Sequence, residues 1–224
     1  MMLTMSPNSP LSTFHFPLDA KRHGFTLVEM IVCVAIFAMM TALVVAKYGN
    51  FNQSVLLTDL AYDTAITIRT AQTYGLGAQS SQTGADSFKY AYGVDFSTAA
   101  GSNDKITMFI DNYPVDNYPV SAPNGVYDSG SDSLVSTYTV TRGAVVSAIC
   151  VSNSDGNDCL SSGVPVGNAN QLDITFQRPN PDAVICANGS CGTKYPFAAI
   201  FIKGTDGSTR EVIVRDTGQI SVQE

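Results

Sequence analysis

Histidine is nearly absent from this 224-residue chain. The two copies are His15 and His23, so residues 24–224 contain none. Ser-His-Asp and Cys-His catalysis need an imidazole base, and histidine metal sites need its ring nitrogens, so neither can form in that part of the chain. Glycine-rich motifs that bind phosphates or dinucleotides are also missing. We therefore expect no enzymatic activity, no metal and no cofactor, in preference to a membrane-anchored enzyme.

Charged residues are few, and the basic ones are the scarcer kind. They make up 14% of the chain, with 12 Lys and Arg against 19 Asp and Glu, and the formal net charge is −7. A nucleic-acid binder needs a basic surface to hold phosphates, so this balance argues against DNA as a partner. The low charge content, with plentiful Ser, Thr, Asn and Gly, is typical of a domain outside the cytoplasm.

An uncharged apolar run extends from Met30 to Ala46. With the residues just before it, the run is long enough to cross a bilayer as a helix. Glu29 lies at its start, and a carboxylate inside a membrane helix costs roughly 2.5–3.5 kcal/mol on insertion scales. A simple anchor needs no such residue, so we expect Glu29 to be functional and to have a partner.

A specific motif precedes this run. The basic pair Lys21 and Arg22 is followed by His-Gly and then by residues 25–29, Phe-Thr-Leu-Val-Glu. The pattern resembles the processing motif of type IV prepilins and type II secretion pseudopilins. In this resemblance the basic pair holds the leader in the cytoplasm. The other interpretation is an ordinary signal anchor that contains a glutamate. A secretory signal peptide fits less well, because the run is too long and no small-x-small cleavage site closes it.

The resemblance implies a role for each residue of the motif. A prepilin peptidase would cut between Gly24 and Phe25 and methylate the new terminal amine of Phe25. Glu29 would then face the terminal amine of a neighbouring subunit during assembly. A buried carboxylate beside an ammonium is less costly than one alone, and the pair fixes the axial register of the incoming subunit.

The resemblance also implies the architecture, the location and the partners. The expected fold class is α+β, a pilin fold in which a long N-terminal helix packs on an antiparallel sheet or sandwich. The parts would be a removed cytoplasmic leader, a transmembrane helix, its amphipathic continuation and a β-rich domain: residues 1–24, 25–48, 49–76 and 77–224. The chain would cross the bacterial inner membrane once, with a cytoplasmic N-terminus, before it enters a periplasmic or cell-surface filament. The implied partners are other pilin or pseudopilin subunits, the prepilin peptidase, an inner-membrane assembly platform and the lipid bilayer.

The pattern beyond the membrane run changes from helix to strand. A helix is predicted over 51–74, because small and apolar residues recur at spacings of three and four, and Gly75 and Gly77 are natural stops. These residues are Leu57, Leu60, Ala61, Thr64, Ile68 and Ala71. Short strands separated by turn residues follow. The predicted strands are 88–96, 105–111, 134–140, 144–151, 171–177, 183–186, 197–203, 211–215 and 219–222. The last two resemble the closing hairpin of FimT/GspH-type minor pseudopilins.

The four cysteines after the membrane run predict two disulfides in an exported domain. Three pairings are possible, and we favour Cys150–Cys159 and Cys186–Cys191, because each pair brackets a turn-rich loop. A four-cysteine zinc site is the alternative, but neither pair has the C-x2-C spacing usual for zinc. The remaining Cys33 lies inside the membrane run and is expected to act as a small apolar residue.

Two loops are candidates for binding. Residues 111–115, Asp-Asn-Tyr-Pro-Val, are repeated at once as 116–120. Tyr113 and Tyr118 of this repeat could contact a neighbouring subunit or an external ligand, or the loop could be a variable surface segment. Residues 153–158 have the composition of a calcium loop but lack its spacing, so an Asx-rich turn is the simpler interpretation.

The leading hypothesis is a structural subunit, a minor pilin or pseudopilin of a type IV pilus or a type II secretion filament. One alternative is a DNA-binding minor pilin, for which Arg210 and Arg215 would supply positive charge. However, Gln219 and Glu224 stand where DNA-binding relatives tend to place arginines. The other alternative is a signal-anchored surface adhesin.

Overall fold

The computed structural model describes residues 24–77, 90–112 and 123–223, and for residues 47–52 it describes the backbone alone. The chain divides into two compact units, Met1–Ala46 and Lys47–Glu224, and each is considered by itself. One helix of 50 residues, α1 (Leu27–Leu76), contributes to both units. The second unit adds strands and a short 3-10 helix, η1 (Asn157–Cys159).

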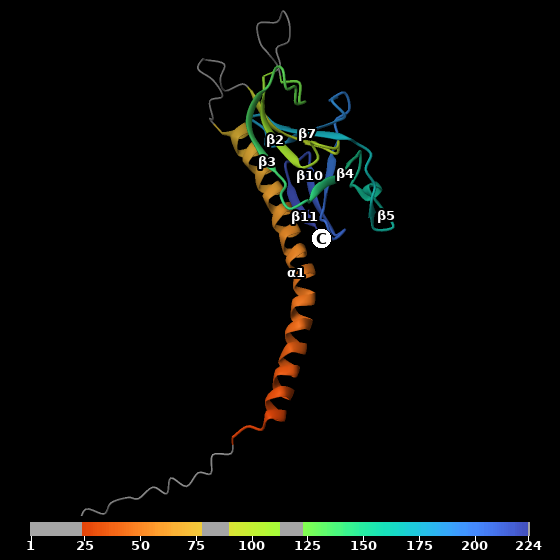
Figure 1. Ribbon diagram of the computed structural model, residues 1–224. Helices are drawn as coiled ribbons and strands as arrows, with labels where there is room; N and C mark the ends of the chain where they lie inside the picture. The colour runs from red at the N-terminus through yellow and green to blue at the C-terminus, as the bar shows by residue number, and fades with distance from the viewer. Residues whose placement is uncertain (1–23, 78–89, 113–122, 224) are drawn as a thin grey trace, which may run out of the picture. The chain divides into compact units, whose positions relative to one another are not determined.

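The strands of the second unit form two main antiparallel sheets (Figure 1). The five-stranded sheet has the order β3-β2-β1-β7-β8, the four-stranded sheet has the order β11-β10-β9-β4, and β5 and β6 form a small hairpin. The strand bounds are β1 Ala91–Ser97, β2 Lys105–Asp111, β3 Ser133–Thr139, β4 Val145–Ser152, β5 Leu160–Ser161, β6 Val164–Pro165, β7 Gln171–Phe176, β8 Ala183–Ala187, β9 Phe197–Lys203, β10 Thr209–Arg215 and β11 Ile220–Gln223.

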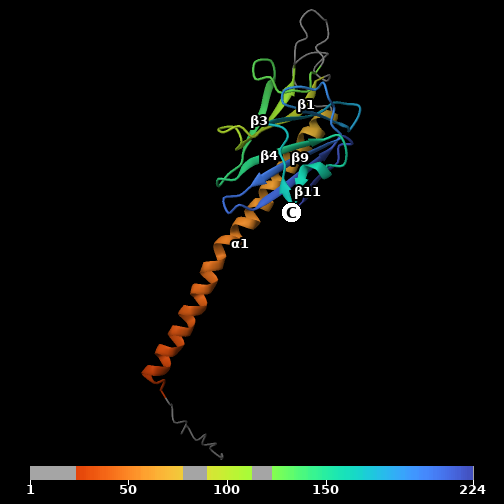
Figure 2. The ribbon, with the colours of Figure 1, turned by 90° about the vertical axis from the view of Figure 1, so that its right-hand side faces the viewer.

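The main core lies where one face of α1 meets the inner faces of both sheets. The six small and apolar residues from Leu57 to Ala71 that predicted this helix form a stripe along α1, and all six are buried. Alternate residues of the strands pack with them, among them Val94 of β1, Ile174 of β7 and Ile200 of β9. Thr64, the polar member of the stripe, donates its hydroxyl to the Leu60 carbonyl at 2.9 Å, so the stripe carries no unpaired hydroxyl. Figure 2 shows strands of the four-stranded sheet crossing this part of α1.

The outer face of each sheet is also covered. On the four-stranded sheet, Phe197 and Phe201 form a second core with the Cys150–Cys159 disulfide. On the five-stranded sheet, the fully buried ring of Phe109 lies 5.1 Å from the ring of Tyr127, measured between centroids. Part of each sheet is therefore buried on both faces, one against the common core and one under a loop, whereas the edge strand β3 is mostly exposed.

Polar side chains of α1 bind the two edge strands nearest to it. Arg69 donates a hydrogen bond to the Ile220 carbonyl of β11 at 3.1 Å. On the other sheet, the Tyr138 hydroxyl of β3 donates to the Asp63 carboxylate at 2.9 Å. Burial, and then this hydrogen bond and the charge of Asp63, raise the pKa of Tyr138 to about 12. The hydroxyl therefore remains a donor well above neutral pH.

The predicted fold class is confirmed, and so are the nine strands predicted from the sequence. β2 and β9 have the predicted bounds, and the others differ at their described ends by one to three residues. α1 ends at Leu76, which is the predicted end of the amphipathic continuation and directly precedes Gly77; of the two expected stops, only Gly75 lies within the helix. A Cβ on Gly75 would lie 2.3 Å from the Phe176 carbonyl oxygen, so this glycine permits close packing of the helix on β7. The β5–β6 hairpin was not predicted, because each strand has only two residues.

Gly93 of β1 generates a prediction about the outer face of the five-stranded sheet. A Cβ at this position would lie 2.6 Å from Cζ of Phe109 and 2.6 Å from Cγ2 of Thr175. We expect Gly93→Ala to lower the free energy of unfolding by about 1–3 kcal/mol, the usual cost of overpacking. Urea unfolding of the detergent-solubilised chain, followed by circular dichroism, measures this. Gly130→Ala is the matched control, because a Cβ there meets nothing within 4 Å, and equal stability of the two variants would contradict the prediction.

Candidate functional site

The segment ahead of α1 is open to solvent. Gly24, Phe25 and Thr26 are non-helical and exposed, and Phe25 keeps 75% of its surface accessible. A Cβ added to Gly24 would meet no atom within 4 Å. The peptide bond at which the sequence predicts cleavage therefore lies in an accessible stretch of chain. The predicted basic residues Lys21 and Arg22 lie outside the described residues.

Thr26 is the N-terminal cap residue of α1. Oγ1 of Thr26 accepts a hydrogen bond from the Glu29 amide at 3.2 Å, and the Thr26 carbonyl accepts one from the Met30 amide at 3.2 Å. Thr followed three residues later by Glu is a capping-box pattern, and a carboxylate in the first turn favours the positive end of the helix dipole. This cap by Thr26 was not predicted, although the Thr-x-x-Glu pattern is readable in the sequence.

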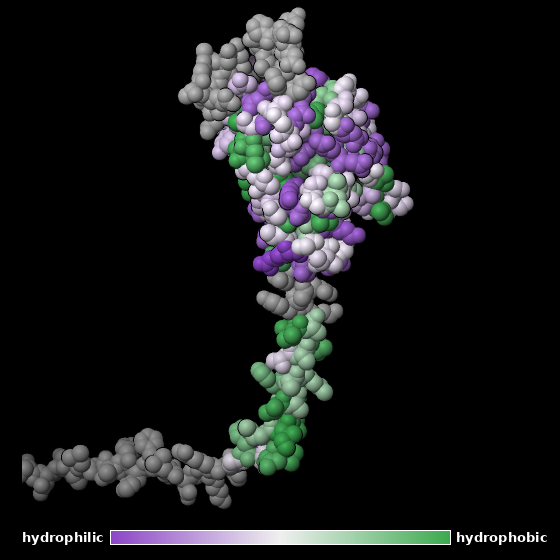
Figure 3. Space-filling view, turned by 45° about the horizontal axis from the view of Figure 1, so that its top comes forward, coloured by the Kyte–Doolittle hydropathy of each residue, from purple (hydrophilic) through white to green (hydrophobic). Residues whose placement is uncertain are grey.

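The first part of α1 is an uncovered apolar surface. The segment Leu27–Ala46 is 20 residues long, and none of it is buried. Figure 3 shows a mostly hydrophobic surface along it. A helix of this length measures about 30 Å, the thickness of the hydrocarbon core of a bilayer. Thr41 donates its hydroxyl to the carbonyls of Phe37 and Ala38 at 2.9 and 3.0 Å, so this polar group is satisfied within the helix.

The carboxylate of Glu29 differs from the hydroxyl of Thr41, which is hydrogen-bonded within the helix. The amide of Glu29 is bonded to Thr26, but no donor among the described residues reaches its carboxylate. A carboxylate at the start of an apolar membrane segment favours a partner of opposite charge. Such a partner would have to come from a residue outside the described ranges or from another molecule.

Both favoured cysteine pairings are present in the structure. Cys150–Cys159 connects β4 to η1, and Cys186–Cys191 connects the end of β8 to the turn after it. Between the first pair, the Asp155 carboxylate accepts hydrogen bonds from the backbone and side-chain nitrogens of Asn157. This is the geometry of an Asx turn. In the described parts of the chain, no group of three His, Cys, Asp or Glu residues is arranged to hold a metal ion.

The two arginines considered for DNA binding are both engaged in packing. Arg210 donates to the hydroxyls of Thr58 and Ser54 on α1 at 3.1 and 3.2 Å. The guanidinium of Arg215 lies over the ring of Phe197, 5.4 Å from its centroid, in a cation–π arrangement. Their positions therefore serve the fold of the second unit. The other predicted contact residues, Tyr113 and Tyr118, lie outside the described residues.

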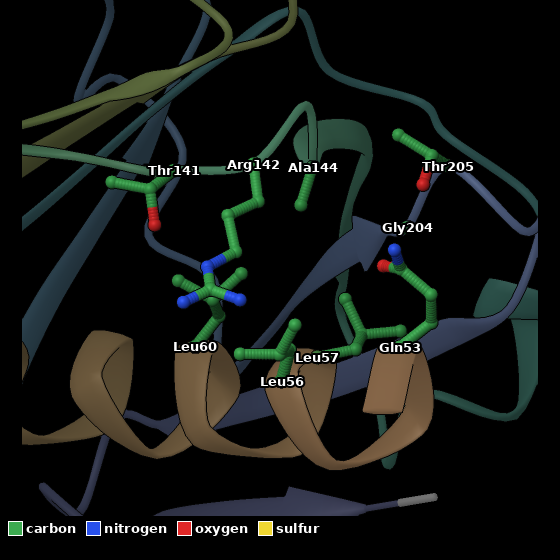
Figure 4. Close-up of a pocket in the computed structure, with 9 residues that line it drawn as sticks. All are labelled: Gln53, Leu56, Leu57, Leu60, Thr141, Arg142, Ala144, Gly204 and Thr205. Atoms are coloured by element: carbon green, nitrogen blue, oxygen red, sulfur yellow. The ribbon is translucent and has the colours of Figure 1, made fainter. Parts of the chain in front are cut away.

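A small hollow beside α1 does not have the size of a ligand site. Figure 4 shows Arg142 reaching from its turn toward the helix on one side of the hollow. The cavity volume is about 10 Å³, whereas ligand pockets usually have roughly 300–1,000 Å³. The lining residues are Gln53, Leu56, Leu57, Leu60, Thr141, Arg142, Ala144, Gly204 and Thr205.

A buried acidic pair was missed by the sequence analysis. Asp95 of β1 and Asp173 of β7 lie directly opposite each other, and Asp173 is fully buried. Burial, and then the charge of Asp95, raise the pKa of Asp173 to about 8, and burial also raises the pKa of Asp95. A sequence shows only two ordinary strand carboxylates here, because strand register cannot be read from it. At neutral pH this pair retains a proton.

Comparison with known families supports the interpretation of the N-terminal segment. Residues 19–45 match the family described as the prokaryotic N-terminal methylation motif. No curated protein and no solved structure matches the chain. Together with the apolar N-terminal helix, this motif indicates a membrane-anchored, type IV pilin-like protein. The motif indicates a structural subunit that a prepilin peptidase processes and that assembles with other pilins.

Proposed function

We propose that the chain is a minor pilin or pseudopilin, a structural subunit of a type IV pilus or a type II secretion filament. In this proposal it crosses the bacterial inner membrane once, with a cytoplasmic N-terminus, and loses residues 1–24. An inner-membrane assembly platform then inserts it into a periplasmic or cell-surface filament through α1. The observation that carries the proposal is the carboxylate of Glu29, to which none of the described residues donates, in the first turn of an uncovered apolar helix next to the methylation motif.

The charge of Glu29 gives a physical reason for assembly. Cleavage after Gly24 would create an ammonium on Phe25, at nearly the same depth in the membrane as Glu29. An ammonium from a neighbouring subunit would supply the opposite charge that Glu29 lacks, and the pair would fix how far the incoming helix slides. The apolar surface of Leu27–Ala46 is suited to lipid before assembly and to neighbouring helices after it.

The second unit would supply the specific contacts of the filament. The buried stripe of α1 packs in the core of the second unit. The helix on which the sheets pack is therefore the same helix that contains the membrane segment. The positions of the two arginines do not support the DNA-binding alternative, since Arg210 is hydrogen-bonded to α1 and Arg215 lies over the ring of Phe197.

The first prediction concerns processing. In cells that contain a prepilin peptidase, we expect the intact mass to correspond to residues 25–224 with one added methyl group on Phe25 and four hydrogens lost to two disulfides. Gly24→Val should remain uncut, because a side chain there would obstruct the peptidase while it meets no atom of the chain itself. Mass spectrometry of the purified protein gives both results. An uncut wild-type chain would contradict the proposal.

The second prediction separates the two roles of Glu29. Gln at this position keeps the capping-box pattern but removes the charge. If the charge directs assembly, Glu29→Gln should enter the membrane normally and be depleted in sheared filaments. A loss of about 1.4 kcal/mol per added subunit would reduce incorporation about tenfold. Immunoblots of filament and membrane fractions measure this ratio.

Thr26→Ala is the control for this experiment. It removes the hydroxyl that caps the Glu29 amide, at a cost of about 1 kcal/mol in helix stability, and leaves the charge in place. We expect it to assemble close to normally. Normal assembly of Glu29→Gln together with failure of Thr26→Ala would show that assembly needs the helix cap and not the charge of Glu29.

A further inference from the structure

A short segment lies across the outer face of the five-stranded sheet. This strap, residues 124–128, passes so close to the Cys186–Cys191 disulfide that a Cβ on Gly125 would lie 2.5 Å from the sulfur of Cys191 and 3.1 Å from that of Cys186. Further along the strap, the ring of Tyr127 lies 5.1 Å from that of Phe109. The strap therefore covers both the disulfide and the buried aromatic ring.

Two buried carboxylates hold the backbone of the strap. Asp111, at the end of β2, accepts hydrogen bonds from the amides of Asn124 and Gly125 at 3.2 and 2.6 Å. Oδ1 of Asp173 accepts one from the Tyr127 amide at 3.0 Å. Both aspartates are fully buried. Hydrogen bonds to carboxylates are stronger than those to neutral acceptors, so these side chains are the principal polar anchors of the strap.

The second anchor is part of a carboxyl pair. Asp95 lies opposite Asp173 across the β1–β7 ladder, and its Oδ1 accepts a hydrogen bond from Nε2 of Gln171 at 3.0 Å. Oδ2 of Asp173 is buried, and none of the described residues donates to it. Two carboxylates in this position repel each other, but one proton between them turns Oδ2 into a donor toward Asp95.

The surroundings favour retention of this proton. The charges that act on Asp173 come from Asp95 and from Asp128 of the strap, and both are negative. Asp132, just beyond the strap, accepts hydrogen bonds from the amides of Asp128 and Asn112, and burial raises its pKa. Of the other neighbours across the ladders, Thr107 faces Asp95 and Cys186, which is in a disulfide, faces Asp173.

We propose that a single proton shared by Asp95 and Asp173 locks the strap on the outer face of the sheet, and that alkaline solution releases it. Alkaline solution favours the open strap because the pKa of Asp173 is raised in the closed state. The closed strap holds the proton up to about pH 8, whereas an open strap would expose Asp173 to water and lower its pKa toward the ordinary value near 4. The equilibrium for opening should therefore increase about tenfold per pH unit between about pH 5 and 8, and level off above this range.

Hydrogen exchange of the full chain in detergent micelles tests the lock. After correction for intrinsic exchange rates, protection of the Tyr127 amide should fall about tenfold per unit from pH 5 to 8 and become constant above it. Reduction of the disulfides by a phosphine gives an independent readout. Cys186–Cys191 should become more reducible over the same pH range relative to Cys150–Cys159, which lies on the other sheet and serves as the internal reference.

Asparagine substitutions identify the proton. Asp173→Asn can accept from the Tyr127 amide and donate to Asp95 without a proton, so its strap should stay protected and lose the pH slope. Asp95→Asn should behave alike, and it keeps the test decisive if the first variant fails to fold. Asp206→Asn, at a fully exposed position, should keep the wild-type slope. Gly125→Ala should open the strap at every pH, which confirms that the assay reports on it.

Two results would overturn the proposal. The first is a wild-type strap whose protection does not change between pH 5 and 9. The second is a pH slope that persists in both asparagine variants, since other groups would then cause it.

Discussion

The buried stripe on the second half of α1 is the contact on which the globular unit depends. Neither sheet could bury its inner face against the other alone, because residues from both converge on the same helix surface. The polar bonds of Arg69 and Asp63 then bring one edge strand of each sheet to the flanks of this stripe. The helix therefore sets the position of both sheets, and a substitution in the stripe would disturb the packing of both.

The loops on the outer faces follow a common plan. On each sheet a glycine with positive φ, Gly125 or Gly156, brings a loop against a buried aromatic residue or a disulfide. In the strap over the five-stranded sheet, backbone amides donate hydrogen bonds to buried carboxylates. Burial of these carboxylates would cost free energy without a proton or such hydrogen bonds. The second unit thus has an apolar core, whose structure depends on how its side chains pack, and outer faces, where a few polar hydrogen bonds position a loop.

Sequence reasoning was most effective where a pattern is periodic. Spacings of three and four identified the stripe from Leu57 to Ala71, and alternation with turn residues placed the strands. It failed where the outcome depends on segments far apart in the chain. The opposition of Asp95 and Asp173 depends on strand register, and Gly75 was taken for a helix stop because its contact with Phe176 comes from a distant strand. The cap formed by Thr26 was legible but was overlooked beside the processing motif.

The spacing of the disulfides has a consequence for how the domain could mature. Cys150 and Cys159 are separated by 9 positions and Cys186 and Cys191 by 5, and neither bridge connects one main sheet to the other. If the chain emerges across a membrane in sequence order, the first two thiols meet before the third is exposed. Oxidation could then follow translocation pair by pair, with little opportunity for scrambled bridges and little dependence on an isomerase to correct them.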